Sequence, residues 1–122
     1  LWLGMLSADA PERAALLLHF KPLIEATARL GYVPEQVDIA TGQQSGTGPV
    51  GFSAALLPLL ASDPSLAAAL AAQRESLHHE PALADAYYNQ SLLMFGQGWD
   101  EQRYRFDKDG RLLPNWTGTC TP

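Results

Sequence analysis

The sequence predicts a mainly α-helical fold that ends in a short β-hairpin. Most of the 122 residues fall into stretches whose apolar side chains recur at helical spacing, and glycine or proline separates these stretches. At residues 103–107 the period changes to two, with aromatic and charged side chains in alternation, and residues 108–110 (Lys-Asp-Gly) supply a turn. The helices follow one another without a repeat of fixed length, an order that suits a ring of helices.

The composition is that of an ordinary globular domain, with 47% hydrophobic and 17% charged residues. The length suits one domain that can bury a core, and no apolar run is long enough for membrane insertion. A net charge of −5 with only 8 Lys and Arg, and no basic cluster, argues against nucleic acid as a partner. The mildly acidic balance is compatible with a neutral substrate such as a polysaccharide, and equally with many other partners.

Two helices are predicted in the first 30 residues. Residues 1–6 have the pattern of the end of a buried helix, and residues 7–12 carry a start signal in which Pro11 suits the first turn. Gly31 is expected to end this second helix. Pro22 lies inside it and should kink or divide it.

The least helical part of the chain is residues 32–49. Residues 37–39 alternate as a short strand, and residues 41–49 are rich in Gly, Ser, Thr and Gln. On this composition alone, the second stretch is typical of a flexible surface loop.

Two further helices follow that loop. The first, residues 51–60, is apolar and should bend near Pro58. The second has an alanine-rich body over residues 66–77, with Asp63 as its cap and Pro64 at its first position.

The histidines do not form a metal-binding pattern. His78 and His79 are adjacent at a helix end, so they cannot both face one metal ion from one helix face, and no cysteine or third histidine is close in sequence. His19 lies alone beside an apolar stripe and is expected to be a packed or surface residue. No metal site is therefore predicted.

The last predicted helix opens with Tyr87 and Tyr88. Tyr88, Leu92 and Phe95 follow at i, i+4 and i+7, which predicts an apolar stripe facing the core. Gly96 and Gly98 are expected to end this helix, because glycine readily takes the left-handed conformation that closes helices.

Three segments carry a resemblance that covers nearly the whole chain. They are LWLGML (1–6), VDIATGQQSGTGPVGFSAALLPLL (37–60) and YYNQSLLMFGQGWDEQRYRFDKDGRLLPNW (87–116). Their sequences resemble the C-terminal end of the glycoside hydrolase family 8 endoglucanases, particularly the periplasmic cellulases that accompany bacterial cellulose synthases. Long segments in the same order make the resemblance far more specific than a short motif.

The resemblance implies part of an (α/α)6 barrel, with residues 1–122 as the C-terminal portion of a single catalytic domain. For the intact enzyme it implies inverting hydrolysis of internal β-1,4 bonds in cellulose or a related β-glucan. No cofactor is implied, because inverting hydrolysis by two carboxyl groups needs none. In that family the general acid lies in the N-terminal half, and the base lies just ahead of the segment that residues 1–6 resemble. This chain would then supply helices, cleft wall and the closing hairpin, but no catalytic residue.

The acidic residues give the same result when they are judged by position alone. Glycoside hydrolysis requires two carboxyl groups on opposite sides of the scissile bond. Most of the 13 Asp and Glu are explained by helix starts, by the hairpin or by solvation. Asp38 is the only acid between strand-like residues beside a Gly-rich loop, and it is expected to serve that loop through its own hydrogen bonds.

Sugar binding is the role that the resemblance leaves to this chain. Tyr87 and Tyr88 match the paired tyrosines of the family, and pyranose rings stack on aromatic side chains. Adjacent helix residues point about 100° apart, so one tyrosine is expected to pack and the other to contact sugar, with burial of both as the alternative. Phe52 and Gln43 are weaker candidates, with residues 41–49 forming the rim of the sugar cleft if they are not simply a surface loop.

The predicted partners are a β-1,4-glucan and the N-terminal portion of the same enzyme, in the bacterial periplasm or secreted. The chain starts inside an apolar segment, which suggests a piece of a longer polypeptide. Cys120 is either an inert thiol or half of a disulfide with a cysteine outside this chain. Two other hypotheses are a non-catalytic helical module for carbohydrate binding or interaction, and a structural remnant without activity.

Overall fold

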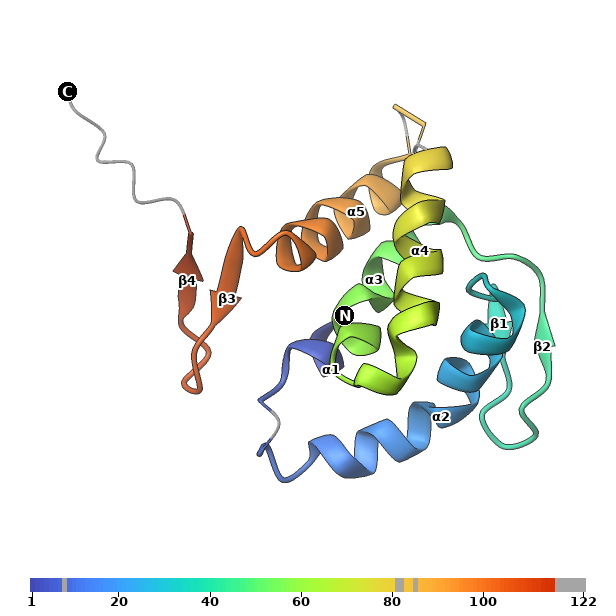
Figure 1. The fold of residues 1–122 in the computed structure, drawn as a ribbon, viewed down its shortest axis with the longest axis horizontal. Helices are drawn as coiled ribbons and strands as arrows, with labels where there is room; N and C mark the ends of the chain where they lie inside the picture. Colours follow the sequence, from blue (N-terminus) through green and yellow to red (C-terminus); the bar gives the residue numbers. More distant parts are fainter. Residues whose placement is uncertain (8, 81–82, 85, 116–122) are drawn as a thin grey trace.

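The structure, a computed structural model, describes residues 1–7, 9–80, 83–84 and 86–115, so Asp85 and Cys120 lie outside it. Its described residues form helices and two small antiparallel sheets (Figure 1). In chain order the elements are α1 (Trp2–Met5), α2 (Arg13–Leu30), β1 (Gln36–Val37), β2 (Gln44–Ser45), α3 (Val50–Ala61), η1 (Pro64–Leu66), α4 (Ala67–His79), α5 (Tyr87–Asp100), β3 (Tyr104–Phe106) and β4 (Leu112–Pro114). Among these residues, no helix combines the length and hydropathy that crossing a bilayer requires.

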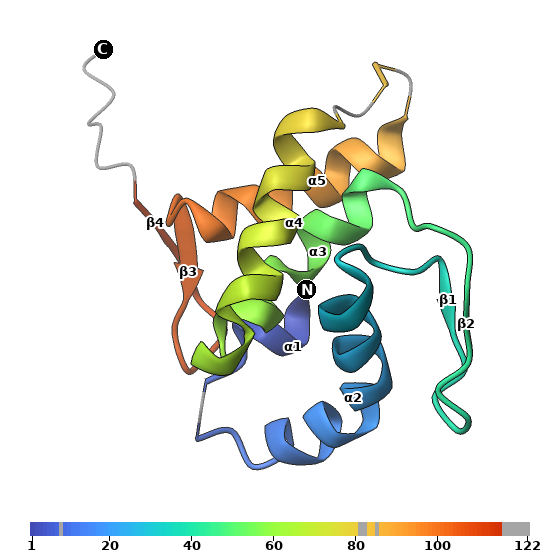
Figure 2. The same ribbon diagram turned by 45° about the vertical axis from the view of Figure 1, so that its right-hand side comes forward.

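Helix α3 is the centre of the fold. It packs most extensively against α5 and then against α4 and α1, and Figures 1 and 2 show it lying between them. Its residues are apolar on nearly every face, which is the pattern of a helix surrounded by other elements. Leu57 and Leu60 are almost completely buried, and Val33 and Ala69 join the same core from the loop after α2 and from α4.

Small residues allow the helices to approach α3 closely. A Cβ atom added to Gly4 of α1 would lie 2.2 Å from the Leu59 backbone nitrogen, and one added to Gly96 of α5 would lie 2.1 Å from the Ala54 carbonyl oxygen. No side chain fits at either contact. The glycines therefore set the distance between helices.

This packing overturns the prediction that Gly96 and Gly98 end the last helix. Helix α5 continues through both glycines to Asp100, and the left-handed conformation is taken instead by Gln102, with φ of 60°. Gly96 lets α5 approach α3 closely, and neither glycine ends the helix. A sequence pattern alone does not distinguish a glycine that ends a helix from one that allows close helix packing.

A buried glutamine connects three elements around the core. The Ser53 hydroxyl of α3 donates to Gln73 Oε1 of α4 at 2.8 Å, and Gln73 Nε2 donates to the Gly31 carbonyl at 3.0 Å. Because Gln73 is fully buried, both ends of its amide need a partner, and both have one. Gly31 has φ of 79° and ends α2, as predicted.

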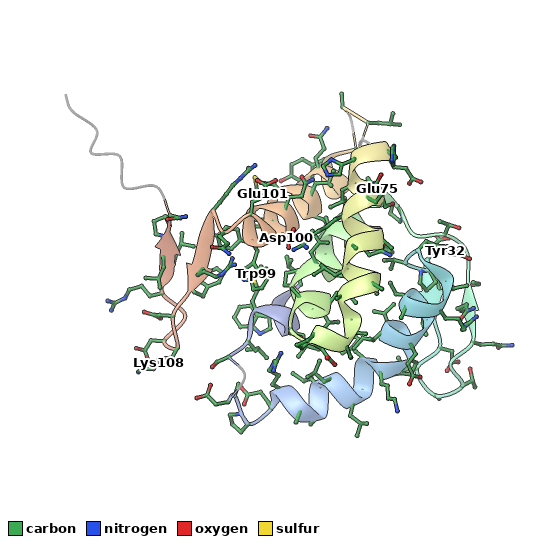
Figure 3. The ribbon with its side chains drawn as sticks, viewed as in Figure 1. Tyr32, Glu75, Trp99, Asp100, Glu101 and Lys108 are labelled. Atoms are coloured by element: carbon green, nitrogen blue, oxygen red, sulfur yellow. The ribbon has the colours of Figure 1, made fainter. Side chains whose placement is uncertain are left out.

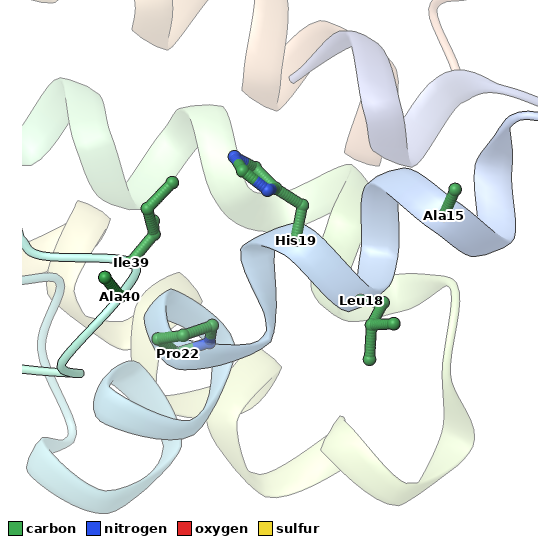
Figure 4. Close-up of a pocket in the computed structure, with 6 residues that line it drawn as sticks. All are labelled: Ala15, Leu18, His19, Pro22, Ile39 and Ala40. Carbon is green, nitrogen blue, oxygen red and sulfur yellow. The ribbon is translucent and has the colours of Figure 1, made fainter.

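Pro22 does not divide α2, which is one helix from Arg13 to Leu30. The helix changes direction along its length, and Pro22 lies where it does so (Figures 2 and 4). This outcome agrees with the predicted kink, since proline removes one helical hydrogen bond and crowds the preceding turn. The helix starts later than residues 9–12, which form turns instead, with the Arg13 amide donating to the Ala10 carbonyl at 3.1 Å.

The predicted strand over residues 37–39 is shifted, because β1 covers Gln36–Val37 and Ile39 lies in the turn that follows. The predicted helix start at Asp63 and the predicted C-terminal hairpin are present. Asp63 caps η1 by accepting a hydrogen bond from the Ser65 amide at 2.9 Å, and Pro64 takes the first helical position. The C-terminal hairpin pairs β3 with β4, with Arg105 opposite Leu113. Residues 32–49 contain a second hairpin, β1–β2, in which Val37 pairs with Gln44.

Candidate functional site

Tyr87 and Tyr88 lie on the first turn of α5, and both side chains are exposed. The exposed fractions are 82% for Tyr87 and 65% for Tyr88. Within the described residues neither tyrosine packs into the core, so the helices of this chain do not provide the expected burial of one or both rings. The expected sugar contact stays a prediction. Two adjacent phenol rings are therefore presented at the start of one helix.

The apolar stripe of α5 is only partly directed toward the core, since Leu92 is half-buried while its aromatic members are exposed. Phe95, which was expected to be buried with Tyr88, is 47% exposed, and its neighbour Met94 is 60% exposed. The helix rests on α3 through its small residues because Gly96 allows the closest approach there. The aromatic stripe is consequently left uncovered by the described residues.

The beginnings of α3 and α5 lie side by side. A Cβ atom on Gly51 would lie 3.0 Å from the Asn89 Cα atom and 2.7 Å from its Oδ1. Phe52, on the same turn of α3, is half-buried and packs against the core, with its ring close to Gly48. The structure thus places Phe52 near the tyrosine-bearing turn, but mainly as a packing residue.

Gln43 lies away from the tyrosines, at the tip of the β1–β2 hairpin, which extends away from the start of α5 in both ribbon views (Figures 1 and 2). Its backbone closes the turn: the Asp38 amide donates to the Gln43 carbonyl at 2.8 Å, and the Gln43 amide donates to Thr41 Oγ1 at 3.2 Å. The structure does not bring Gln43 together with Tyr87, Tyr88 and Phe52.

Asp38 is a turn-forming residue, as predicted. Its Oδ1 accepts hydrogen bonds from the backbone amides of Ala40 at 2.8 Å and Thr41 at 2.9 Å. These bonds lower the pKa of Asp38, the Thr41 amide having the largest effect. A general acid requires a raised pKa, so Asp38 has the opposite character.

The other acidic residues with a defined partner have structural roles as well. The pKa of Asp63 is lowered by its hydrogen bonds to Ser65, and that of Asp9 by its hydrogen bond from Ser7. Glu75 Oε1 lies 2.7 Å from His79 Nε2 within α4. Three acidic residues, Asp9, Glu12 and Asp107, line the same surface hollow between the α1–α2 connection and the β3–β4 turn. The pKa of Asp9 is lowered there, and Asp107 Oδ1 accepts hydrogen bonds from the Asp109 and Arg111 amides, so both of these residues have structural partners.

An ion pair that no sequence pattern indicates joins α4 to α5. Arg74 contacts Asp100 through two hydrogen bonds, Nε to Oδ2 at 2.9 Å and Nη2 to Oδ1 at 2.7 Å. The Asp100 side chain is only 14% exposed, and the pair raises the pKa of Arg74. Figure 3 shows Asp100 beside Trp99 at the end of α5. The two partners are far apart in the sequence, so only the fold reveals them.

Aromatic contacts fasten the C-terminal hairpin to the end of α5. The Arg105 guanidinium lies 4.0 Å from the centre of the Trp99 ring and donates to the Trp99 carbonyl. The Tyr104 hydroxyl donates to the Phe95 carbonyl at 2.7 Å, and burial raises the pKa of Tyr104. Trp99 therefore has a structural role in the described chain.

Two surface hollows are present at other places on the molecule. One, of about 470 Å³, lies between α2 and the loop after β1 and is lined by Leu18, His19, Pro22 and Ile39 among others (Figure 4). The other, of about 620 Å³, lies between the α1–α2 connection and the β3–β4 turn. Neither contains the tyrosines. The described residues include no group of three or more His, Cys, Asp and Glu placed to hold a metal ion.

Comparisons with known proteins identify the family. Residues 1–102 match the model of the glycosyl hydrolases family 8. An endoglucanase of Escherichia coli (strain K12) is 47% identical over 120 residues, covering 98% of this chain and 32% of the relative. An endoglucanase of Xanthomonas axonopodis pv. citri (strain 306) is 45% identical over 123 residues, with the same two coverages.

A solved structure supports the same assignment. The crystal structure of endo-1,4-D-glucanase from Vibrio fischeri ES114 superposes with a TM-score of 0.77 at 36% identity, covering 96% of this chain and 34% of that one. The chain belongs to glycoside hydrolase family 8, and its helices are part of the (α/α)6 barrel fold of that family. The predicted resemblance and fold class are confirmed. The chain spans about a third of the length of the relatives it matches.

Proposed function

We propose that this chain is the C-terminal part of an endoglucanase that hydrolyses internal β-1,4 bonds of cellulose or a related β-glucan. Membership of family 8 and the similarity to proteins named endoglucanase support this proposal. The polypeptide would act in the bacterial periplasm or outside the cell, where the polymer is accessible. Within it, this chain forms a wall of the cleft, and the remaining two-thirds supplies the general acid and the base.

The single observation that carries the proposed role is the pair of exposed tyrosines at the start of α5. Phenol rings without a packing partner provide flat apolar faces, and a pyranose ring has an apolar face of matching size. A cleft wall needs such surfaces at its rim. Tyr88 and Tyr87 are therefore the proposed sugar-binding residues, and Phe52 supports them from the adjacent turn of α3.

Inverting hydrolysis of a glycosidic bond by two carboxyl groups requires no cofactor. One carboxyl group protonates the glycosidic oxygen, and the other activates a water molecule on the opposite face of the sugar, which inverts the anomeric centre. The contribution of this chain is to hold the glucan in line with those two groups. Positioning of that kind lowers the barrier because the reacting atoms are already oriented.

The test is substitution of Tyr88 in the whole polypeptide. Tyr88→Ala should lower kcat/KM on soluble cello-oligosaccharides about tenfold, since loss of one aromatic stacking contact corresponds to roughly 1.4 kcal/mol of binding. Tyr88→Phe keeps the ring and should retain most of the activity. Wild-type kinetics for the alanine variant would remove Tyr88 from the site.

The 122-residue chain alone provides a second arm of the same experiment. Incubated with carboxymethylcellulose, it should release no reducing ends, because it lacks the acid and the base. Hydrolysis by the isolated chain would contradict the proposed division of roles. Tight glucan binding without hydrolysis, even in the whole polypeptide, would favour the alternative of a non-catalytic carbohydrate-binding module.

A further inference from the structure

The turn that carries the tyrosines lacks the usual helix cap. Helix α5 begins after Ala86, whose side chain makes no capping hydrogen bond, and its first turn contains no acidic residue. A side-chain cap normally satisfies a free amide and fixes how the chain enters the helix. Another group must therefore hold the connection before α5 if the first turn is to have a defined position.

Gln90 is placed to do this. Its Nε2 donates to the Leu83 carbonyl at 2.8 Å and to the Ala84 carbonyl at 2.9 Å. Both N–H groups of one amide are thus directed back across the segment that precedes the helix. The Ala86 amide also donates to the Leu83 carbonyl at 3.0 Å, and the Gln90 amide to the Ala86 carbonyl at 2.9 Å. Together these bonds join Leu83 and Ala84 to Ala86 and Gln90 at the start of α5.

In the chain, the tyrosines lie between Leu83 and Ala84 on one side and Gln90 on the other, the groups that these hydrogen bonds join. With 82% and 65% of their surfaces exposed, the rings of Tyr87 and Tyr88 gain little of their position from packing. Their backbone is held on one side by Asn89, which rests against Gly51 of α3. On the other side, the two Gln90 hydrogen bonds tie Leu83 and Ala84 to the start of the helix, so the entry of the chain into the turn that carries the rings depends on both anchors.

We infer that Gln90 is a positioning residue that orients Tyr87 and Tyr88 for glucan binding. This inference rests on the proposed function, because Gln90 affects glucan binding only by positioning Tyr87 and Tyr88. Gln90 itself contacts no sugar. It replaces the missing helix cap with a longer side chain that reaches back over the turn.

The experiment is a double-mutant cycle in the whole polypeptide. Gln90→Glu keeps the size of the side chain but places carboxylate oxygens against two carbonyl oxygens, so the KM for cello-oligosaccharides should rise threefold to tenfold. In a Tyr87→Ala/Tyr88→Ala background the same change should have no further effect, because the groups that Gln90 orients are gone. Gln90→Lys, which restores N–H donors, should recover most of the wild-type KM.

The control is Gln97→Glu, the same substitution on the same helix two turns later. No hydrogen bond of the Gln97 side chain is present in the described part of the chain, so its KM should stay at the wild-type value. A rise in KM of equal size in both tyrosine backgrounds would overturn the inference, as would no rise in either. An equal rise would show that Gln90→Glu acts independently of the tyrosines, through stability alone. No rise would show that Gln90 has no effect on glucan binding.

A readout without substrate separates this inference from the proposed function. In Gln90→Glu, the backbone order parameters of Tyr87 and Tyr88 from NMR relaxation should fall from about 0.85 toward 0.6. If the order falls while the tyrosine variants bind glucan normally, Gln90 positions the turn but the proposed sugar contacts are wrong. If the order is unchanged, the inference about Gln90 fails whatever the kinetics show.

Discussion

At the scale of single residues, short polar side chains organise the connections through hydrogen bonds to nearby amides. Asp38 closes the β1–β2 turn, Asp63 starts η1, and Asp107 Oδ1 accepts from the amides of Asp109 at 2.9 Å and Arg111 at 2.8 Å. Each contact spans four residues or fewer. Such roles can be predicted from sequence, because the donor and the acceptor are fixed by local geometry.

The lowered pKa of Asp38 predicts a pH dependence with a definite sign. The folded-state pKa lies below the ordinary value of 3.8, so the ionised form stabilises the turn above that pH. The stabilisation is lost as the pH falls through the folded-state pKa. Amide hydrogen exchange at Ala40 and Thr41 should therefore accelerate at acid pH beyond the intrinsic change in exchange rate.

Asp38→Asn is the matched control for this prediction. The asparagine keeps the Oδ1 acceptor but does not titrate, so the protection of the two amides should be nearly independent of pH in this range. Identical pH profiles of protection for the wild-type protein and the variant would show that Asp38 does not stabilise the turn through its charge.

At the scale of elements, the helices were predictable and the faces on which they pack were not. The stop at Gly31, the Asp63-Pro64 start and the C-terminal hairpin follow from local chemistry and are present. The orientation of α5 was predicted wrongly because the largest apolar side chains were assumed to face inward. What decides the orientation is the distance of closest approach to α3, a property of two elements that neither segment reveals alone.

This account predicts that Gly96→Ala is destabilising although alanine favours helices. The new Cβ atom would lie 2.1 Å from the Ala54 carbonyl oxygen, a backbone atom that cannot move without shifting α3. Overpacking of this kind costs about 1–3 kcal/mol, more than the roughly 1 kcal/mol that alanine gains in helix propensity. Urea denaturation should show a lower free energy of unfolding.

Gly98→Ala provides the comparison within the same helix. Its Cβ atom would lie 3.1 Å from Tyr104 Cε1, an atom of a side chain that can adjust. We expect a change of less than about 1 kcal/mol. Equal destabilisation by the two substitutions would show that helix propensity or a general effect of the methyl group, and not contact with α3, determines the result.

At the scale of the whole molecule, the described residues bury one helix well and leave others half covered. Helix α3 has neighbours on most sides, whereas α5 exposes Tyr88, Met94 and Phe95, and α2 exposes Leu18 at 71%. Family 8 relatives are about three times as long as this chain. The candidate site follows the same pattern: the sequence indicates the tyrosines, and only the fold shows that both are exposed.

The exposed stripe of α5 predicts how the isolated chain should behave in solution. A continuous apolar surface of this kind favours association, because contact with a second copy removes the side chains of Met94 and Phe95 from water. Light scattering of the 122-residue chain should show a mass that rises with concentration. Met94→Gln/Phe95→Gln should shift the equilibrium toward the monomer, whereas Leu112→Gln, at a similarly exposed position on β4, should not. If the wild-type chain is monomeric at every concentration and unfolds cooperatively, then α5 needs no covering partner, and the proposed dependence on a longer polypeptide is refuted.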